Sequence, residues 1–283
     1  MAQTGQVTVN QTYLLEVDTD PSVSGVAAPQ GSLAMLQGGS GFWQKTGSGD
    51  TNWTVVAGSG GTGTVGISAH QFFEDFLIRD FAGHNGQFDW NSISTGGGSN
   101  VTIDSGAPDN TSSGVITITP GTTTTGRSTL ESFNGANRLL AGGAQTIEWR
   151  VQVASLSTLA QRYIIRAGIM DGNAAGDPAN GVYFKYSDNV NSGQWQGIAR
   201  NASTSTTVNS TVAVTAAAWH KLRLQVNTAG TNVDFYVDDV LIGSATTNIP
   251  TGNPMRFMVT MEKTTGTTNI NALADSLYYR TER

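Results

Sequence analysis

The chain has 283 residues, of which 35 are Gly, only 13% are charged and none is Cys, and its formal net charge is −6. Few charges and abundant Thr and Gly disfavour long surface helices and suit strands and tight turns, so we predict an all-β fold. The missing Cys excludes disulfides and thiolate sites, and the acidic balance without a Lys/Arg cluster argues against nucleic acid as a partner.

The first region, residues 1–57, contains short strand-like segments separated by turn-forming residues. They are Val7–Val9, Tyr13–Val17, Leu33–Leu36 and Trp53–Val56. Residues 58–71 follow as a linker that begins with the Gly-rich run GSGGTGTVG. The N-terminus lacks the basic and apolar segments of a signal peptide, and no apolar run is long enough to span a membrane. We therefore expect a product made in the cytoplasm, with no membrane partner.

The segment His70–Phe81, HQFFEDFLIRDF, fits two secondary structures. Its apolar residues recur at helical spacing, but they can also be placed on a strand. Because β-forming residues outnumber helix-forming ones here, we favour a strand that enters the large domain. A short helix between the two domains is the alternative.

Residues 72–283 carry repeated strand patterns, which are clearest in residues 219–246. There, apolar and polar residues alternate with the period of two that a strand with one buried face requires. The predicted inward-facing residues are His220, Leu222, Leu224, Val226, Val233, Phe235 and Val237. The Asp238-Asp239 step then turns the chain into Val240–Ala245 as a hairpin.

Other segments of the same region complete a set of antiparallel strands. They are Thr146–Val153, Arg162–Met170, Val182–Tyr186, Trp195–Arg200, Met255–Met261 and Ser276–Arg280. So many apolar residues cannot leave either side of one sheet in water, so a second sheet must cover it. We predict that residues 72–283 form a large antiparallel β-sandwich.

Acidic and histidine side chains form no recognisable catalytic pattern. Glu131 and Glu148 are isolated acids in separate segments, and the three histidines have no spacing for a metal site or a nucleophile–base pair. His220 shares a strand face with apolar residues and is expected to be structural. Ser-His-Asp chemistry stays open, because its members need not be close in sequence. We expect no enzyme activity.

Residues 171–177, DGNAAGD, resemble half of a calcium loop. Oxygen-bearing side chains recur around glycines, and Ca²⁺ prefers oxygen ligands. The candidate ligands are Asp171, Asn173 and Asp177. The bidentate acid that would close the loop is missing, so a hairpin loop with Asx turns is the alternative. No other cofactor is expected.

A group of aromatic residues with one arginine is a candidate sugar-binding platform. It consists of Tyr183, Tyr186, Trp195 and Arg200. Sugar rings stack their C–H faces on aromatic rings, which favours a ligand site. The alternative is that Tyr186 faces the core and Trp195 is its neighbour across a hairpin.

The N-terminal region contains a recognisable motif in residues 28–57. Its features are Ala28-Pro29, Gly31-Ser32-Leu33, Phe42-Trp43-Gln44-Lys45-Thr46 and Trp53-Thr54-Val55-Val56. It resembles the short motif near the N-terminus of many tailed-bacteriophage fibre, spike and head-fibre proteins. The resemblance implies a small β-meander that anchors the protein to the virion through Pro29, Gly31, Leu33, Trp43 and Trp53. Such a small unit buries little surface alone, so we expect it to pack against its own copies or other virion proteins.

Residues 72–283 resemble concanavalin A-like, laminin-G-like jelly-roll domains of phage virion proteins. The matching segments include Asn180-Gly181-Val182-Tyr183-Phe184, Trp219-His220-Lys221-Leu222 and Phe235-Tyr236-Val237-Asp238. Enzymatic members of this fold carry a Glu-x-Asp-x-x-Glu strand, which this sequence lacks. The fold also hosts lectins and structural domains, so it does not by itself decide the function.

Together the two resemblances imply a non-catalytic structural protein on the surface of a phage particle, as a head decoration, head fibre or short tail fibre. They also imply a homotrimer, which is the usual state of such fibres. A glycan-binding receptor adhesin is the alternative function, and a polysaccharide-degrading enzyme is a third.

Overall fold

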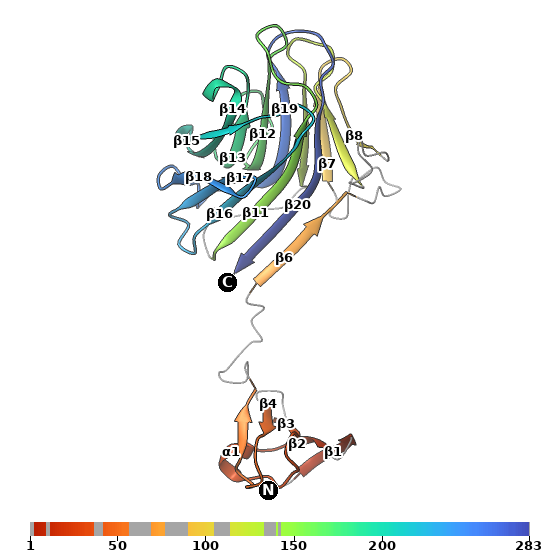
Figure 1. The fold of residues 1–283 in the computed structure, drawn as a ribbon, viewed down its shortest axis with the longest axis vertical. Helices are drawn as coiled ribbons and strands as arrows, with labels where there is room; N and C mark the ends of the chain where they lie inside the picture. The colour runs from red at the N-terminus through yellow and green to blue at the C-terminus, as the bar shows by residue number, and fades with distance from the viewer. Residues whose placement is uncertain are drawn as a thin grey trace. The chain divides into compact units, whose positions relative to one another are not determined.

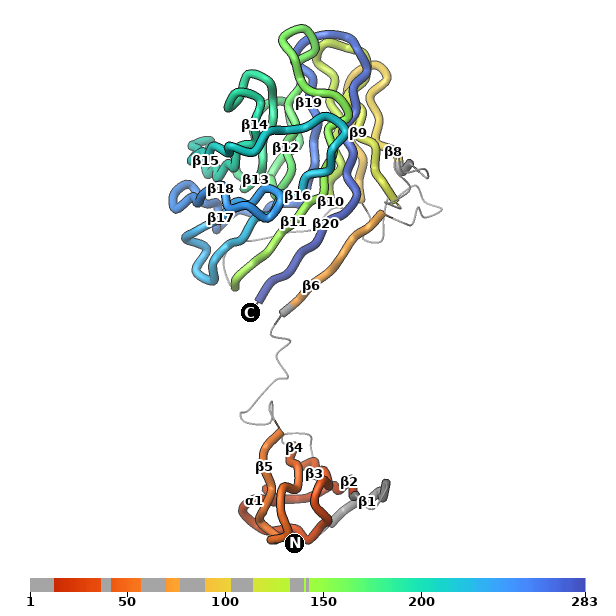
Figure 2. Tube along the Cα trace, viewed as in Figure 1, coloured from red at the N-terminus to blue at the C-terminus, as the bar shows by residue number. Residues whose placement is uncertain are grey.

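The structure is a computed structural model that describes residues 3–9, 12–36, 42–56, 69–76, 90–104, 114–132, 140 and 143–282. The chain divides into two compact units, Met1–Ile67 and Ser68–Arg283, and each is described by itself. Figure 1 shows both units as built almost entirely from strands, and Figure 2 follows the course of the chain in the same view. None of the described helices is long and apolar enough to cross a membrane.

The N-terminal unit contains one five-stranded sheet in the order β1-β2-β3-β4-β5. Its strands are β1 (Gln3–Val9), β2 (Thr12–Val17), β3 (Leu33–Leu36), β4 (Phe42–Lys45) and β5 (Trp53–Val55). Strands β3, β4 and β5 form the predicted meander. Strand β2 is parallel to β3, which the meander prediction did not include. A parallel pair needs a crossover, and the short helix α1 (Pro21–Ser24) lies in it.

A small core holds this sheet together. It is formed by Leu15, Val17, Val26, Ala34, Trp43 and Trp53. The buried ammonium group of Lys45 donates to the carbonyl oxygens of Val26 and Gly49 at 3.0 and 2.5 Å, and it lies 5.1 Å from the Trp53 ring centre. Backbone carbonyls and an aromatic face thus compensate the one cation in this core.

The C-terminal unit contains two large sheets, the first with seven strands. Its order is β15-β14-β13-β12-β19-β10-β7. The strands are β7 (Trp90–Thr95), β10 (Arg127–Ser132), β12 (Tyr163–Met170), β13 (Gly181–Tyr186), β14 (Gln194–Asn201), β15 (Thr204–Ala213) and β19 (Arg256–Lys263). All neighbours in this sheet are antiparallel. The short 3-10 helix η1 (Asn191–Gly193) lies between β13 and β14.

The second large sheet has eight strands and is also antiparallel. Seven of them follow the order β18-β17-β16-β11-β20-β9-β8, and β6 pairs with β20. The strands are β6 (Ala69–Glu74), β8 (Asn100–Asp104), β9 (Val115–Thr119), β11 (Gln145–Val153), β16 (Trp219–Val226), β17 (Val233–Val237), β18 (Val240–Ala245) and β20 (Ala272–Glu282).

The main hydrophobic core lies between the two large sheets. Aromatic rings from opposite sheets meet there: Phe184 of β13 and Phe235 of β17 have ring centres 5.6 Å apart, as do Trp90 of β7 and Trp149 of β11. Gly197 of β14 lies under the Phe235 ring, where an added Cβ would come within 2.4 Å of the ring. The fold is thus the predicted all-β sandwich, of the concanavalin A-like jelly-roll type.

The predicted strands coincide with observed ones across the described residues. The inward-facing set of residues 219–237 is buried, including His220. Asp238 and Asp239 have φ of 51° and 66°, as the tight hairpin between β17 and β18 requires. In the ambiguous segment 70–81, the strand is correct as far as Glu74, and residues 77–81 lie outside the described residues. Residues 69–71, which we placed in the linker, belong to β6, and residues 57–68 lie outside the described residues.

Candidate functional site

The sheets of the sandwich each turn one face away from the core, and both faces carry functional candidates. We call the outer face of the seven-stranded sheet the loop-covered face, because residues 171–180, between β12 and β13, lie on it. Strand alternation and register place on it Arg127, Thr129, Glu131, Arg166, Gly168, Met170, Tyr183, Lys185, Ile198, Arg200, Arg256, Met258, Thr260 and Glu262.

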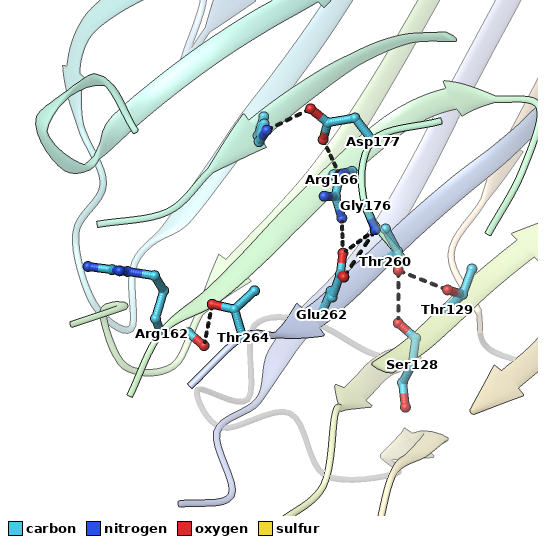
Figure 3. Close-up of polar contacts among 10 residues, drawn as sticks. Ser128, Thr129, Arg162, Arg166, Gly176, Asp177, Thr260, Glu262 and Thr264 are labelled. Atoms are coloured by element: carbon cyan, nitrogen blue, oxygen red, sulfur yellow. Dashed lines mark hydrogen bonds and ion pairs between the residues drawn. The ribbon is translucent and has the colours of Figure 1, made fainter. Parts of the chain in front are cut away.

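A buried arginine forms the centre of the loop-covered face (Figure 3). The Arg166 guanidinium donates to the carboxylates of Asp177 and Glu262, both at 2.8 Å, and its side chain is 2% exposed. The ammonium group of Lys185 donates to the other Asp177 oxygen at 2.8 Å. The backbone N–H of Gly176 donates to both Glu262 oxygens at 3.1 Å. These contacts fasten the loop to three strands.

The charges in this network compensate one another. Burial by itself raises the pKa of the Asp177 carboxyl. The hydrogen bonds and charges of Lys185 and Arg166 outweigh that effect and hold the pKa of Asp177 below its usual range. Asp177 therefore stays ionised at neutral pH as the counterion of two cations.

A second buried acid, Glu131, lies further along the same face. Its carboxylate accepts hydrogen bonds from Arg256 at 2.8 Å, from Asn173 of the loop at 3.1 Å and from Asn91 of β7 at 3.4 Å. Glu131 is isolated from other acids in the sequence, but in the structure its side chain is only 3% exposed and well partnered. Register separates it from Glu262 by four residues along β19.

These positions matter for chemistry, because acid–base catalysis on sugars needs two carboxyl groups that face one substrate bond. Asp177, Glu262 and Glu131 on the loop-covered face are each paired with Arg or Lys, and Asp171 of the loop accepts a hydrogen bond from the Asn180 amide. Among the described residues, no group of three His, Asp or Glu side chains is arranged to hold a metal ion. The loop-covered face thus consists of charged side chains that are paired with one another beneath the loop.

The predicted calcium ligands all lie in or beside the loop but do not converge. Asp177 is held by Arg166 and Lys185, Asn173 donates to Glu131, and Asp171 accepts from the Asn180 amide at 2.7 Å. These partners occupy the side chains that Ca²⁺ would have to bind. The hairpin-loop alternative describes the observed geometry, and the calcium site stays a prediction.

The aromatic residues of the predicted sugar-binding platform do not lie on the protein surface. Tyr186 and Trp195 lie in the main core, where their ring centres are 5.6 Å apart. Tyr183 points to the opposite side of the sheet and packs with Met170, Ile198 and Met258. All three aromatic side chains are at most 1% exposed. Arg200 donates to the Pro178 carbonyl and the Ser205 hydroxyl. The platform prediction was wrong, since neighbouring β13 residues alternate between two buried faces.

His220, which was predicted to be structural, is fully engaged by its neighbours. Its Nδ1 lies 2.8 Å from a carboxylate oxygen of Asp238, and its Nε2 accepts from the backbone N–H of Thr215 at 3.3 Å. Because a base needs a free lone pair facing its nucleophile, this arrangement does not serve nucleophile activation. The imidazole links strand β16 to the turn after β17.

The outer face of the eight-stranded sheet, which we call the open face, has a different character. Six of its side chains stand in register across six strands and form what we call the transverse row. The successive backbone pairs are Leu241 with Tyr236, Tyr236 with Arg223, Arg223 with Glu148, Glu148 with Tyr278, and Tyr278 with Phe73. Leu241 and Phe73, at the two ends, are 52% and 54% exposed.

Contacts within the transverse row orient its side chains. The Arg223 guanidinium stacks on the Tyr236 ring at 4.4 Å from the ring centre. Its Nη1 lies 3.8 Å from Glu148 Oε2, which is beyond hydrogen-bond distance. Burial raises the pKa of Glu148, and the charges of Lys221 and Arg223 partly oppose that shift. The middle of the row therefore keeps hydrogen-bonding capacity.

This row was not predicted from the sequence. The alternation in residues 219–246 identified Arg223 and Tyr236 as outward-facing, which is correct. Nothing in that pattern aligns them with Glu148, Tyr278 and Phe73, which come from distant parts of the chain. Only the strand register brings them together.

The five predicted anchor residues have structural roles in the N-terminal unit. Trp43 and Trp53 are core residues, and Leu33 is half-buried on β3. Gly31 has a φ of 90°, which favours glycine, and Pro29 is exposed in the same turn. No contact of these residues bears on attachment to a virion, so that role stays a prediction.

Comparison with known proteins identifies the fold of the C-terminal unit. No curated protein matches the chain. Among solved structures, the protein of unknown function SO2946 from Shewanella oneidensis MR-1 is 15% identical, with a TM-score of 0.53, covering 78% of this chain and 89% of that one. The Emp47p carbohydrate recognition domain is 10% identical with a TM-score of 0.51, covering 76% and 96%. An endo-1,3-beta-glucanase from Streptomyces sioyaensis is 14% identical with a TM-score of 0.51, covering 76% and 97%.

These identities show a shared fold and nothing finer. The family model described as SO2946-like, C-terminal domain, matches residues 111–274, which is more than half of the chain. That match contains both buried acids of the loop-covered face, Glu131 and Glu262, and four strands of the transverse row. The chain therefore belongs to the SO2946-like family through its C-terminal domain.

Proposed function

We propose that this protein is a non-catalytic carbohydrate-binding protein whose β-sandwich contacts the glycan. The observation that carries the proposal is the open face, where aromatic rings and charged side chains lie side by side and partly accessible. Such a surface suits sugars, because they present both C–H faces and hydroxyl groups. The fold of the Emp47p carbohydrate recognition domain and of the endo-1,3-beta-glucanase supports the same class of ligand.

The pairing of the buried acids favours binding without hydrolysis. Glu131, Glu262 and Asp177 all serve as counterions of Arg or Lys, so none is poised as a general acid or base. A glycosidase would have to release one of them and open the loop. We therefore keep hydrolysis as the alternative that the binding experiment also tests.

The experiment is a glycan array and a set of immobilised polysaccharides, probed with the full chain. Binding of at least one glycan, without release of reducing ends on prolonged incubation, is the expected result. No binding to any glycan would remove the proposal, and release of reducing ends would replace it with an enzyme.

For the N-terminal unit we propose attachment to a larger assembly, with a tailed-phage particle as the specific candidate and a homotrimer as the expected state. The supporting observation is the apolar outer face of its sheet, where Leu14, Met35 and Phe42 are 45%, 43% and 37% exposed beside a small core with six buried residues among those that the structure describes. Exposed apolar side chains on so small a unit favour a partner. A chain that lacks residues 1–57 should keep the melting transition of the sandwich and lose particle binding. Retained particle binding would exclude this role.

A further inference from the structure

We infer that the transverse row is the glycan-binding site, and that its ligand is a neutral polysaccharide chain that runs across the strands. This inference rests on the proposed function and specifies its site and ligand class. The row contains Leu241, Tyr236, Arg223, Glu148, Tyr278 and Phe73, which come from β18, β17, β16, β11, β20 and β6.

The length of the row fits an extended chain. Neighbouring strands lie about 4.8 Å apart, so six successive strands place the ends of the row roughly 24 Å from each other. This distance accommodates several sugar rings in line. A single sugar would use only one part of the row, so the geometry favours a polymer over a monosaccharide.

The order of side chains along the row suits a sugar polymer. Aromatic rings stand on both sides of a polar centre: Tyr236 on one side, and Tyr278 with Phe73 on the other. Arg223 stacks on Tyr236 and thereby fixes the ring before any ligand arrives. At the centre, the 3.8 Å gap between Arg223 and Glu148 leaves Glu148 able to accept hydrogen bonds from sugar hydroxyls. Arg223 donates to Asp239 through Nη1 and has further N–H groups, because a guanidinium carries five.

The charges on the open face select for a neutral ligand. The basic side chains near the row already have acidic partners: Arg150 with Asp275 at 2.5 Å, Lys221 and Arg223 with Asp239 at 2.5 and 2.9 Å, and Arg280 with Glu282 at 2.6 Å. An acidic polysaccharide would have to displace these carboxylates, so it gains little from the face.

A protein partner fits the row less well than a polysaccharide does. Acidic residues are depleted at the centres of protein interfaces, although Arg is enriched there, and Glu148 occupies the centre of this row beside Arg223. Burying them under an apolar partner would cost their desolvation. Sugar hydroxyls, in contrast, replace the water that these groups lose.

The test is affinity electrophoresis of the full chain in native gels that contain laminarin or galactomannan as neutral polysaccharides, or alginate as an acidic one. We expect the neutral polysaccharides to retard the wild type. The variants Tyr236→Ala and Tyr278→Ala should each bind about tenfold more weakly, which is about 1.4 kcal/mol. The matched control is Phe42→Ala, which removes an exposed aromatic ring from the N-terminal unit and should bind like the wild type.

A further variant distinguishes a direct loss of binding from a loss caused by misfolding. Tyr236→Phe keeps the ring and should keep most of the binding, and circular dichroism melts should show that all variants fold. Equal retardation of the wild type and both alanine variants would overturn the row as the site while leaving the proposed function intact. Retardation by alginate alone would overturn the neutral class. Failure of the wild type to bind any polysaccharide would remove both proposals. Row variants that turn an oligomer into a monomer in sedimentation would show that the row is a protein interface and would overturn it as the glycan site.

Discussion

The two outer faces of the sandwich carry the same types of side chain, but these side chains have different roles. Each has an arginine between carboxylates: Arg166 between Asp177 and Glu262, and Arg223 between Glu148 and Asp239. Arg166 is 2% exposed under the loop, whereas Arg223 is 21% exposed on the open face. The buried ion pairs of Arg166 therefore hold the loop-covered face in one arrangement. The more exposed pairs of Arg223 leave the side chains of the open face able to exchange partners.

We expect the largest loss of stability from a substitution on the loop-covered face. Arg166→Ala would leave Asp177 and Glu262 without their buried counterion, and we expect a loss of about 3–5 kcal/mol in the free energy of unfolding. Urea denaturation of the full chain measures it. Arg223→Ala is the matched control on the open face and should cost much less. Similar losses for the two variants would mean that the faces do not differ as described.

The ion pair between Arg162 and Asp188, whose side chains are partly exposed, should make the stability depend on pH. The Asp188 carboxylate accepts two hydrogen bonds from Arg162, at 2.8 and 2.9 Å, and one from Ser157 at 2.7 Å. The Arg162 hydrogen bond is the main cause that lowers the pKa of Asp188 to about 2. Because the folded-state pKa lies below the unfolded one, the stabilisation is present above about pH 4 and is lost as pH falls through about 2.

Thermal melts between pH 7 and pH 2 test this assignment. Asp188→Asn should lower the melting temperature at pH 7 and make it fall less steeply between pH 4 and pH 2. Asp18→Asn, at an exposed position of the N-terminal unit, is the control and should follow the wild type. An unchanged pH profile for Asp188→Asn would show that this carboxyl does not titrate as described.

The smallest predicted effect has the opposite sign and belongs to the open face. Burial raises the pKa of Glu148 above its unfolded value, so its protonated form is favoured on folding and that contribution is lost as pH rises through the folded-state pKa. At pH 7 the ionised carboxylate therefore carries a cost. Glu148→Gln should raise the melting temperature slightly at pH 7 and have no effect at pH 3. A lower melting temperature at pH 7 would show that the contact with Arg223 outweighs burial.

A neutral side chain at position 148 also separates stability from binding. If Glu148 accepts hydrogen bonds from sugar hydroxyls, Glu148→Gln should weaken polysaccharide binding while it stabilises the fold. The two readouts then move in opposite directions, as expected for a group kept for binding.

Much of the fold followed from local pattern. The alternation in residues 219–237 predicted the buried faces of β16 and β17, including His220, because successive strand residues point to opposite sides whatever the rest of the chain does. The same rule holds in β13, where Tyr183 and Tyr186 lie on opposite faces, but both faces are buried: one by the second sheet and one by the loop. Alternation reports which residues share a face and not what covers that face.

The strands, the two-layered sandwich and the lack of a Glu-x-Asp-x-x-Glu strand could be predicted from the sequence, because they depend on residues close together in the chain. Two features required the three-dimensional arrangement: residues 171–180 close the seven-stranded sheet, and one row is formed by Tyr236, Arg223, Glu148, Tyr278 and Phe73. The reason is that register between distant strands is set by how their buried faces pack across the core, and a shift of one residue would turn each of these side chains to the other side.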